Sequence, residues 1–144
     1  MKTLSGISIV FALLFISACN QKSEKDNFSN LNLISIHEIT IKPGVDEKEF
    51  ESFVMSEIAP LYGKLEGQDL FLTKGYVGQR TGQYAIFITF PTIEDRNNVY
   101  PLSGGFSEEF DKIMEGKDAL WEKFNSMAEG FDGAHCTDYV RVGQ

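Results

Sequence analysis

The sequence predicts a single α+β domain whose elements follow the order strand, helix, strand, strand, helix, strand. Its 144 residues are enough for one hydrophobic core and too few for two. Three runs rich in β-branched and aromatic residues, 33–41, 70–77 and 84–90, have the composition of strands. Two stretches, 46–61 and 107–127, begin with capping residues and repeat their apolar side chains at helical spacing.

The first strand and the first helix are marked by turn and capping residues. The run 33–41 ends at a Lys-Pro-Gly turn, residues 42–44. Asp46 and Glu49 then have the spacing of a capping box, so a helix begins there. Pro60 is expected to kink or end this helix, and a following glycine closes it.

The central and C-terminal elements follow from similar signals. A short polar link with glycine at each end joins 70–77 to 84–90, which is typical of a hairpin. Residues 92–100 open with a capping threonine and predict a short helix. Ser107 caps one longer helix that runs to Gly130, and the alternation in 138–142 predicts a last short strand.

Right-handed crossovers turn this order into a ferredoxin-like, four-stranded antiparallel sheet with both helices on one face. The runs 70–72 and 84–90 are apolar on both faces of their strands, a pattern typical of strands buried on both sides. The helices cover only one side. The sequence therefore predicts a homodimer in which a second copy of the sheet covers the other.

Composition and charge narrow the range of partners. Hydrophobic residues make up 42% of the chain, which is not the composition of a disordered protein. The formal net charge is −8, so phosphate backbones should repel the chain and no nucleic-acid partner is expected. The sequence has no glycine-rich phosphate loop and no catalytic-triad spacing, and no cofactor is predicted.

Residues 1–18 have the features of a signal peptide. Lys2 precedes an apolar core, residues 7–16, that is too short to span a bilayer. The tetrapeptide ISAC at 16–19 resembles the bacterial lipobox, which implies a diacylglyceryl thioether on Cys19. Acyl chains on that residue would hold the protein at a membrane. An ordinary signal peptide followed by a chance cysteine is the alternative.

The lipobox also predicts the location of the protein and the state of its second cysteine. Residues 19–32 are polar and read as a flexible tether, so the folded domain, 33–144, lies just off a membrane of the cell envelope. Asn20 favours the outer over the inner membrane, whereas the leaflet stays open. Lipidated Cys19 cannot pair with Cys136, which leaves that thiol buried or bridged to another chain.

The residues around the first predicted turn resemble those of a known group of proteins. The segment IKPG at 41–44, followed by the acidic helix start VDEKEF at 45–50 and the element order above, resembles the dimeric α+β barrel superfamily. Its antibiotic-biosynthesis-monooxygenase-like branch is the nearest, and NIPSNAP-like domains are also similar. The resemblance covers residues 33–142. It implies a ligand cavity between sheet and helices, in a group that includes cofactor-independent oxygenases, haem-degrading enzymes and proteins of no known activity.

His37 is the candidate catalytic residue. It lies seven residues before Gly44, where the resemblance places a functional asparagine of the haem-degrading relatives. Alternation along the strand puts His37 on one face with Ile39 and Ile41, the face expected to meet the helices. An imidazole there could hydrogen-bond or deprotonate a phenol or an enol. The alternative is a partly buried histidine bonded to a neighbour.

Trp121 and Tyr84 are the candidate ligand-binding residues. An indole on the second helix could form the floor of an apolar pocket, and a tyrosine on the hairpin could reach it; core packing is the alternative for both. Haem-degrading relatives also need an axial histidine on this helix, and residues 110–127 contain none. That difference argues against haem as a cofactor.

No metal site is predicted. His135, Cys136 and Asp138 are possible ligands, but the segment lacks the repeated spacing of a zinc site. Adjacent residues on a strand point to opposite faces, so His135 and Cys136 cannot share a proton as a nucleophile pair.

The sequence therefore predicts a lipid-anchored envelope protein with a small-molecule-binding α+β barrel domain. In the enzymatic interpretation it is a cofactor-independent, monooxygenase-like oxidoreductase that uses His37 beside Trp121. In the other interpretation it is a non-enzymatic binding or interaction module. A polar-lined cavity around His37 would favour the first, and the ligand itself is not predicted.

Overall fold

The computed structural model describes residues 33–133 and 135–142. The predicted signal peptide, the tether and the lipidated Cys19 lie outside these residues. Within them, none of the helices is long and apolar enough to cross a bilayer.

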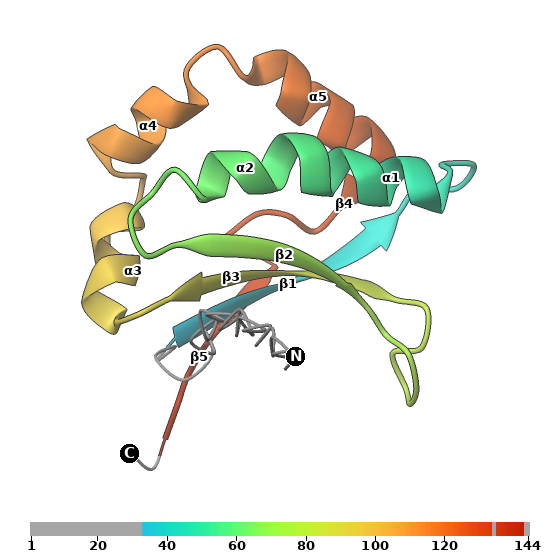
Figure 1. Ribbon diagram of the computed structural model, residues 1–144, viewed down its shortest axis with the longest axis horizontal. Helices are drawn as coiled ribbons and strands as arrows, with labels where there is room; N and C mark the ends of the chain where they lie inside the picture. Colours follow the sequence, from blue (N-terminus) through green and yellow to red (C-terminus); the bar gives the residue numbers. More distant parts are fainter. Residues whose placement is uncertain (1–32, 134, 143–144) are drawn as a thin grey trace, which may run out of the picture.

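The sheet is antiparallel throughout and has β1 at its centre (Figure 1). Strand β1 spans Leu33–Ile41; on one side it pairs with β3 (Tyr84–Phe90), which in turn pairs with β2 (Asp69–Lys74). On its other side β1 pairs with both β4 (Ala128–Glu129) and β5 (Cys136–Val140). This strand order confirms the predicted α+β, ferredoxin-like arrangement.

The sheet has five strands where four were predicted, because the edge position beside β1 is divided. Strand β4 pairs with Thr40 and Ile41, whereas β5 pairs with residues 33–37. Gly130, at φ 100°, turns the chain away from β1 between the two. Strand β5 also begins two residues earlier than the predicted 138–142.

The first helical segment lies along one face of the sheet (Figure 1). It consists of α1 (Glu47–Phe53), a π-helical turn (Val54–Ile58) and α2 (Ala59–Tyr62). The carboxylate of Asp46 accepts a hydrogen bond from the Glu49 amide at 2.9 Å, as the capping pattern predicts. Pro60 does not end the helix, which continues to Tyr62, because the wider π turn before it accommodates a residue that has no N–H to donate.

The other helices differ in part from the prediction. The short helix α3 (Ile93–Val99) is confirmed, with Thr92 as its N-cap. The single helix expected from Ser107 to Gly130 is wrong: α4 (Glu108–Met114) and α5 (Asp118–Met127) are separate. Gly116 lies between them at φ 69°, a conformation that a continuous α-helix cannot contain.

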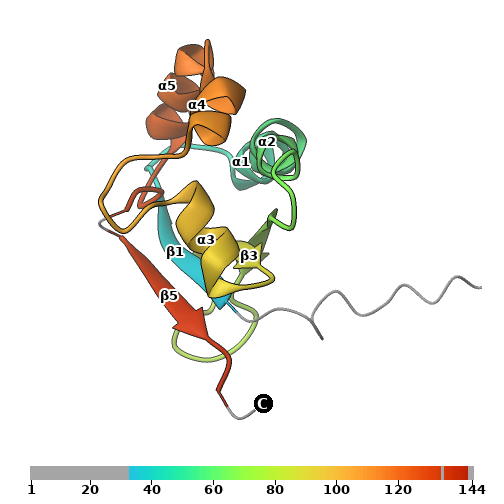
Figure 2. The same cartoon turned by 90° about the vertical axis from the view of Figure 1, so that its left-hand side faces the viewer.

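The core lies between the sheet and the helices, which Figure 2 shows stacked on one side of the strands. Inward-facing side chains of β1 and β3 belong to one buried cluster with side chains of α1, α2 and α5, and burial alternates along β1, so the predicted inner face of β1 is confirmed. The largest fully buried side chains are Phe50, Phe90, Phe124, Ile58, Leu70, Ile86 and Val54.

The opposite surface, which we call the open sheet face, is covered by no helix in the described part of the chain (Figure 2). Its central side chains are apolar and half-buried, and Phe71 stacks on Phe87 with ring centroids 5.2 Å apart. The apolar character predicted for both faces of the hairpin is therefore confirmed. The residues at its centre are Ile34, Ile36, Phe71, Ala85 and Phe87.

Candidate ligand-binding cavity

A cavity of about 640 Å³ lies between the inner face of the sheet and the C-terminal helices. Strands β1 and β5 and helix α3 bring polar side chains to its wall. Helices α4 and α5 and the loops that flank them bring mainly apolar ones, with Asp111 and Asp132 as charged exceptions. The polar lining residues include Ser35, His37, Arg96, Asp111, Cys136 and Asp138. The aromatic lining residues are Tyr62, Tyr100, Phe106, Phe110, Trp121 and Phe131.

His37 projects from β1 into this region and is only 8% exposed. Its ring meets the ring of Phe131 edge-on, with centroids 4.8 Å apart. Burial lowers the pKa of His37 below its ordinary 6.5, and the backbone of Asp132 and the charge of Asp138 only partly oppose this. Nδ1 has no hydrogen-bond partner among the described residues. The site therefore holds a neutral imidazole with one unused nitrogen.

Cys136 lies directly opposite His37 in the β1–β5 register. Both side chains thus share one face of the sheet, and both line the cavity. Burial raises the pKa of the Cys136 thiol, and the negative charge of Asp138 adds to the effect. The Sγ–H group donates to the Gly133 carbonyl at 3.5 Å. Because the thiol stays protonated, it is not an activated nucleophile.

His135, the neighbour of Cys136, has no part in the cavity. It is exposed, and its Nδ1 lies 2.8 Å from Oδ1 of Asp132. His135 and Cys136 therefore do not form a nucleophile pair, as expected. The sequence did not predict that Cys136 lies opposite His37. Across the described residues, no group of three or more histidines, cysteines or carboxylates could hold a metal ion.

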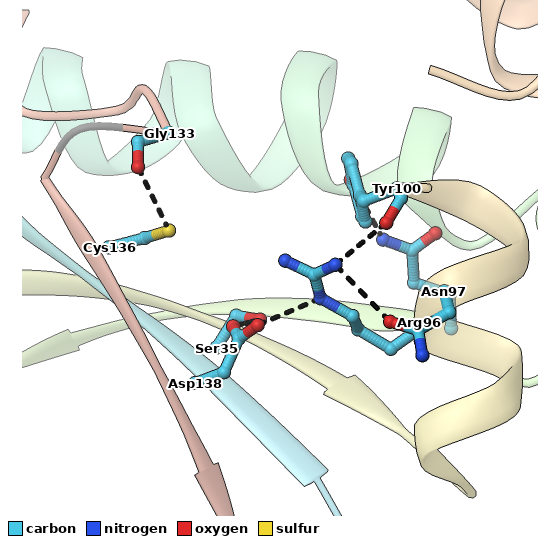
Figure 3. Close-up of polar contacts among 8 residues, drawn as sticks. Ser35, Arg96, Asn97, Tyr100, Gly133, Cys136 and Asp138 are labelled. Carbon is cyan, nitrogen blue, oxygen red and sulfur yellow. Dashed lines mark hydrogen bonds and ion pairs between the residues drawn. The ribbon is translucent and has the colours of Figure 1, made fainter. Parts of the chain in front are cut away.

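Arg96 joins α3 to the strands through Asp138 (Figure 3). Its Nε lies 2.8 Å from Oδ2 of Asp138 in an ion pair that lacks the geometry of a hydrogen bond. The Ser35 hydroxyl donates to Oδ1 of the same carboxylate. Nη1 donates to the Tyr100 carbonyl at 2.7 Å, and the guanidinium lies over the Tyr100 ring, 5.7 Å from its centroid. Side-chain exposures of 20% for Arg96 and 30% for Asp138 show that this network is largely shielded from water.

Two buried tyrosines, Tyr62 and Tyr100, add hydroxyl groups to the lining of the cavity. Burial raises the pKa of Tyr100 to about 12 and lifts that of Tyr62 well above its ordinary value. The Gln68 amide donates to the Tyr100 hydroxyl at 3.3 Å. Both phenols therefore stay protonated near neutral pH and offer hydroxyl groups rather than charges.

The structure brings two of the three predicted site residues together. His37 and Trp121 line the same cavity, and the indole ring lies 6.0 Å from the ring of Phe131, which also contacts His37. Tyr84 does not line this cavity: its hydroxyl donates to Oε1 of Glu51 at 2.5 Å, beside α1. A ligand role for Tyr84 in this cavity is therefore not supported.

Sequence reasoning missed Arg96 and Asp138. Arg96 lies in a short polar helix that reads as solvated surface, and Asp138 lies in an alternating strand. Only the fold brings these two residues together, so no local pattern marks them. The rule that buried charges are paired would have applied only once the packing of α3 was known.

Comparison with known proteins adds little beyond the architecture. No family model matches the sequence, and no curated protein matches it. The solved structure of HapK from Hahella chejuensis is similar at 16% identity and TM-score 0.48, over 78% of this chain and 94% of that one. An ethyl tert-butyl ether d (ethd) family protein from Bacillus halodurans C-125 is similar at 17% identity and TM-score 0.41, over 78% of this chain and 99% of that one. The fold assignment therefore stands on the strand order, and no activity is taken from these two proteins.

Proposed function

We propose that the folded domain binds a small, planar, largely apolar molecule in the cavity beside His37 and Trp121. The observation that supports this is the cavity itself, about 640 Å³ with several aromatic side chains and a few convergent polar groups in its wall. Small-molecule sites commonly enclose about 300–1,000 Å³ and have this kind of lining. An interaction module that used only its outer surface would not need such a space.

A catalytic role follows if His37 accepts a proton from the ligand. Its neutral imidazole has an unused nitrogen and lies among apolar rings, so it can act as a general base towards a phenol or an enol. Such a substrate, once deprotonated, can reduce dioxygen without a cofactor. One oxygen atom then enters the substrate and the other leaves as water, with the substrate supplying the electrons. This is the monooxygenase-like candidate; the non-enzymatic candidate is binding without this step.

The fluorescence of Trp121 can test the binding proposal, because it is the single tryptophan of the chain. We expect 2-naphthol to quench the emission of the full-length protein, purified in mild detergent, in a saturable manner. If neither fluorescence nor calorimetry detects saturable binding of 2-naphthol or of its carboxylate and carboxamide analogues, the proposed function is refuted.

Oxygen uptake with 1,4-naphthalenediol, corrected for the spontaneous rate and matched to the formation of 2-hydroxy-1,4-naphthoquinone and water, separates the two candidates, because simple oxidation to 1,4-naphthoquinone would release hydrogen peroxide instead. A general base contributes about 10²–10⁴-fold, so His37→Ala should abolish the catalysed uptake. His135→Ala is the matched control, because it removes the other histidine of the chain, which lies outside the cavity. Saturable binding without catalysed uptake would favour the non-enzymatic module.

We also propose that lipid on Cys19 holds this domain at a membrane of the cell envelope. The support is the lipobox-like sequence alone. Intact-mass measurement should show an acylated chain that Cys19→Ala converts to an unmodified, soluble one. Cys136→Ala is the matched control and should leave the mass increment in place, and an unmodified wild-type chain would contradict the proposal.

A further inference from the structure

Arg96 presents one edge of its guanidinium to the cavity. Nε and Nη1 are engaged by Asp138 and by the Tyr100 carbonyl. The remaining nitrogen, Nη2, donates no hydrogen bond to any described residue. Figure 3 draws it on the side of the guanidinium that faces away from α3, without a dashed line. Contacts at Nε and Nη1 hold the guanidinium in one orientation, and Nη2 is left able to donate a hydrogen bond to a ligand.

Arg96 is also the one permanently positive side chain among the described residues that line this cavity. The lining carboxylates are Asp111, Asp132 and Asp138, and their charges would repel an anion at most other points of the wall. Asp132 is itself paired with His135, at 2.8 Å. An anionic group entering the cavity is therefore directed to the open edge of Arg96.

We propose that the ligand of this cavity is an aromatic carboxylate whose carboxyl group binds Nη2 of Arg96. The inference rests on the proposed function, since it names the class of molecule that the same cavity takes. The aromatic body of the ligand lies against Phe110, Trp121 and Phe131, and the carboxylate points towards α3.

Asp138 is a positioning residue in this arrangement. Its carboxylate holds Nε of Arg96, and Ser35 fixes the carboxylate in turn. The same carboxylate shares the positive charge of Arg96, which weakens the attraction for a bound anion. A charge-assisted hydrogen bond of ordinary strength changes affinity by about ten- to a hundredfold. Because Asp138 weakens the attraction of Arg96 for the anion, we expect an effect at the lower end of this range, about tenfold.

Two probe molecules of nearly the same shape isolate the contribution of the ligand's negative charge to binding. 2-Naphthoate and 2-naphthamide have the same rings and nearly the same shape, but only the first is an anion. Calorimetric titration of the full-length protein in mild detergent at pH 7 should show 2-naphthoate binding about tenfold more tightly. In Arg96→Gln this preference should disappear, because the naphthoate affinity falls about tenfold while the naphthamide affinity stays within about twofold. Arg96→Lys should recover part of the preference.

Arg80→Gln is the matched control. Arg80 also forms an ion pair with a carboxylate, Glu38, but it lies outside this cavity, so its loss should leave both affinities unchanged. Equal binding of the two probes by the wild-type protein would overturn the inference and leave the proposed function standing. Equal loss of both probes in Arg96→Gln would make Arg96 a merely structural residue and would also overturn it. If the wild-type protein binds neither probe, nor 2-naphthol, the proposed function itself fails.

Discussion

His37 is a titratable ring that folding removes from water, and its protonation is therefore coupled to stability. Burial lowers its pKa in the folded protein, whereas in the unfolded chain the ring recovers a pKa near its ordinary 6.5. Between these two values the unfolded chain binds a proton that the folded protein does not. Lowering the pH through this window therefore favours unfolding.

We predict that the free energy of unfolding falls as the pH is lowered from about 7 towards the lowered pKa of His37. One proton taken up on unfolding gives a slope of at most about 1.4 kcal/mol per pH unit. Urea denaturation at closely spaced pH values measures this slope. His37→Gln removes the titrating group, and the slope in the same window should become smaller.

The glutamates with shifted pKa values titrate at lower pH than the ring of His37 does in the unfolded chain. Salt bridges with Arg80 and Lys74 lower the pKa of Glu38 and Glu47 below their ordinary 4.5, so their contributions to stability are lost only at more acidic pH. Equal slopes for the wild-type protein and His37→Gln between pH 5 and 7 would show that His37 ionises in the folded state much as it does in water.

Single-residue reasoning placed His37 beside Trp121, and the structure shows both lining one cavity, but it missed Arg96 and Asp138. Alternation along β1 placed His37 on the inner face because the period of a strand is fixed. Tyr84 lies on the same inner face of β3 as Ile88, which lines the cavity. Tyr84, however, lies four residues earlier, about 13 Å along the strand, and so reaches α1 instead. Periodicity shows which face of the sheet a side chain lies on. Which helix that side chain meets depends on how the helices pack along the strand.

At the scale of the elements, the break between β4 and β5 depends on one close backbone approach. A Cβ atom added to Gly130 would lie 2.0 Å from the carbonyl oxygen of Glu38 on β1. Gly130 also has φ 100°, which other residues rarely adopt. The chain leaves the sheet here, and Phe131 follows directly to contact His37. The glycine therefore shapes one wall of the cavity.

We predict that Gly130→Ala destabilises the protein by about 3 kcal/mol or more, because both the backbone conformation and the contact with Glu38 must change. Gly44→Ala is the matched control: it has φ 86°, and its added Cβ would meet nothing within 4 Å. That variant should lose only the conformational part, about 1–2 kcal/mol. Chemical denaturation of the two variants measures the difference, and equal losses would contradict the role given to the close approach.

The elements themselves were largely predictable, and the exceptions have local causes. Capping residues marked the starts of three helical segments, and the paired glycines marked the hairpin. The interruption at Gly116 was missed because a glycine inside an apolar periodic pattern is often tolerated in a helix. The π turn before Pro60 was missed because nothing in the local sequence separates it from a kink.

At the scale of the whole molecule, no helix of the described chain covers the open sheet face (Figure 2). Ile36 lies opposite Phe87 in the register, and Phe87 opposite Phe71, so three large apolar side chains form one row across the sheet. The ion pair between Arg80 and Glu38 lies beside this row. An apolar centre with a charged margin is the composition of a protein interface.

We predict that the protein dimerises through the open sheet face. Covering the row with its copy removes apolar area from water at about 25 cal/mol per Å², which favours association. With Cys19→Ala to remove the lipid, sedimentation at micromolar concentration should give the mass of a dimer. Adding Ile36→Lys would bury a charge in the interface and should give a monomer of unchanged fold. Met55→Lys is the control, since Met55 is an exposed helical side chain away from this face. A monomeric parent protein would contradict the prediction.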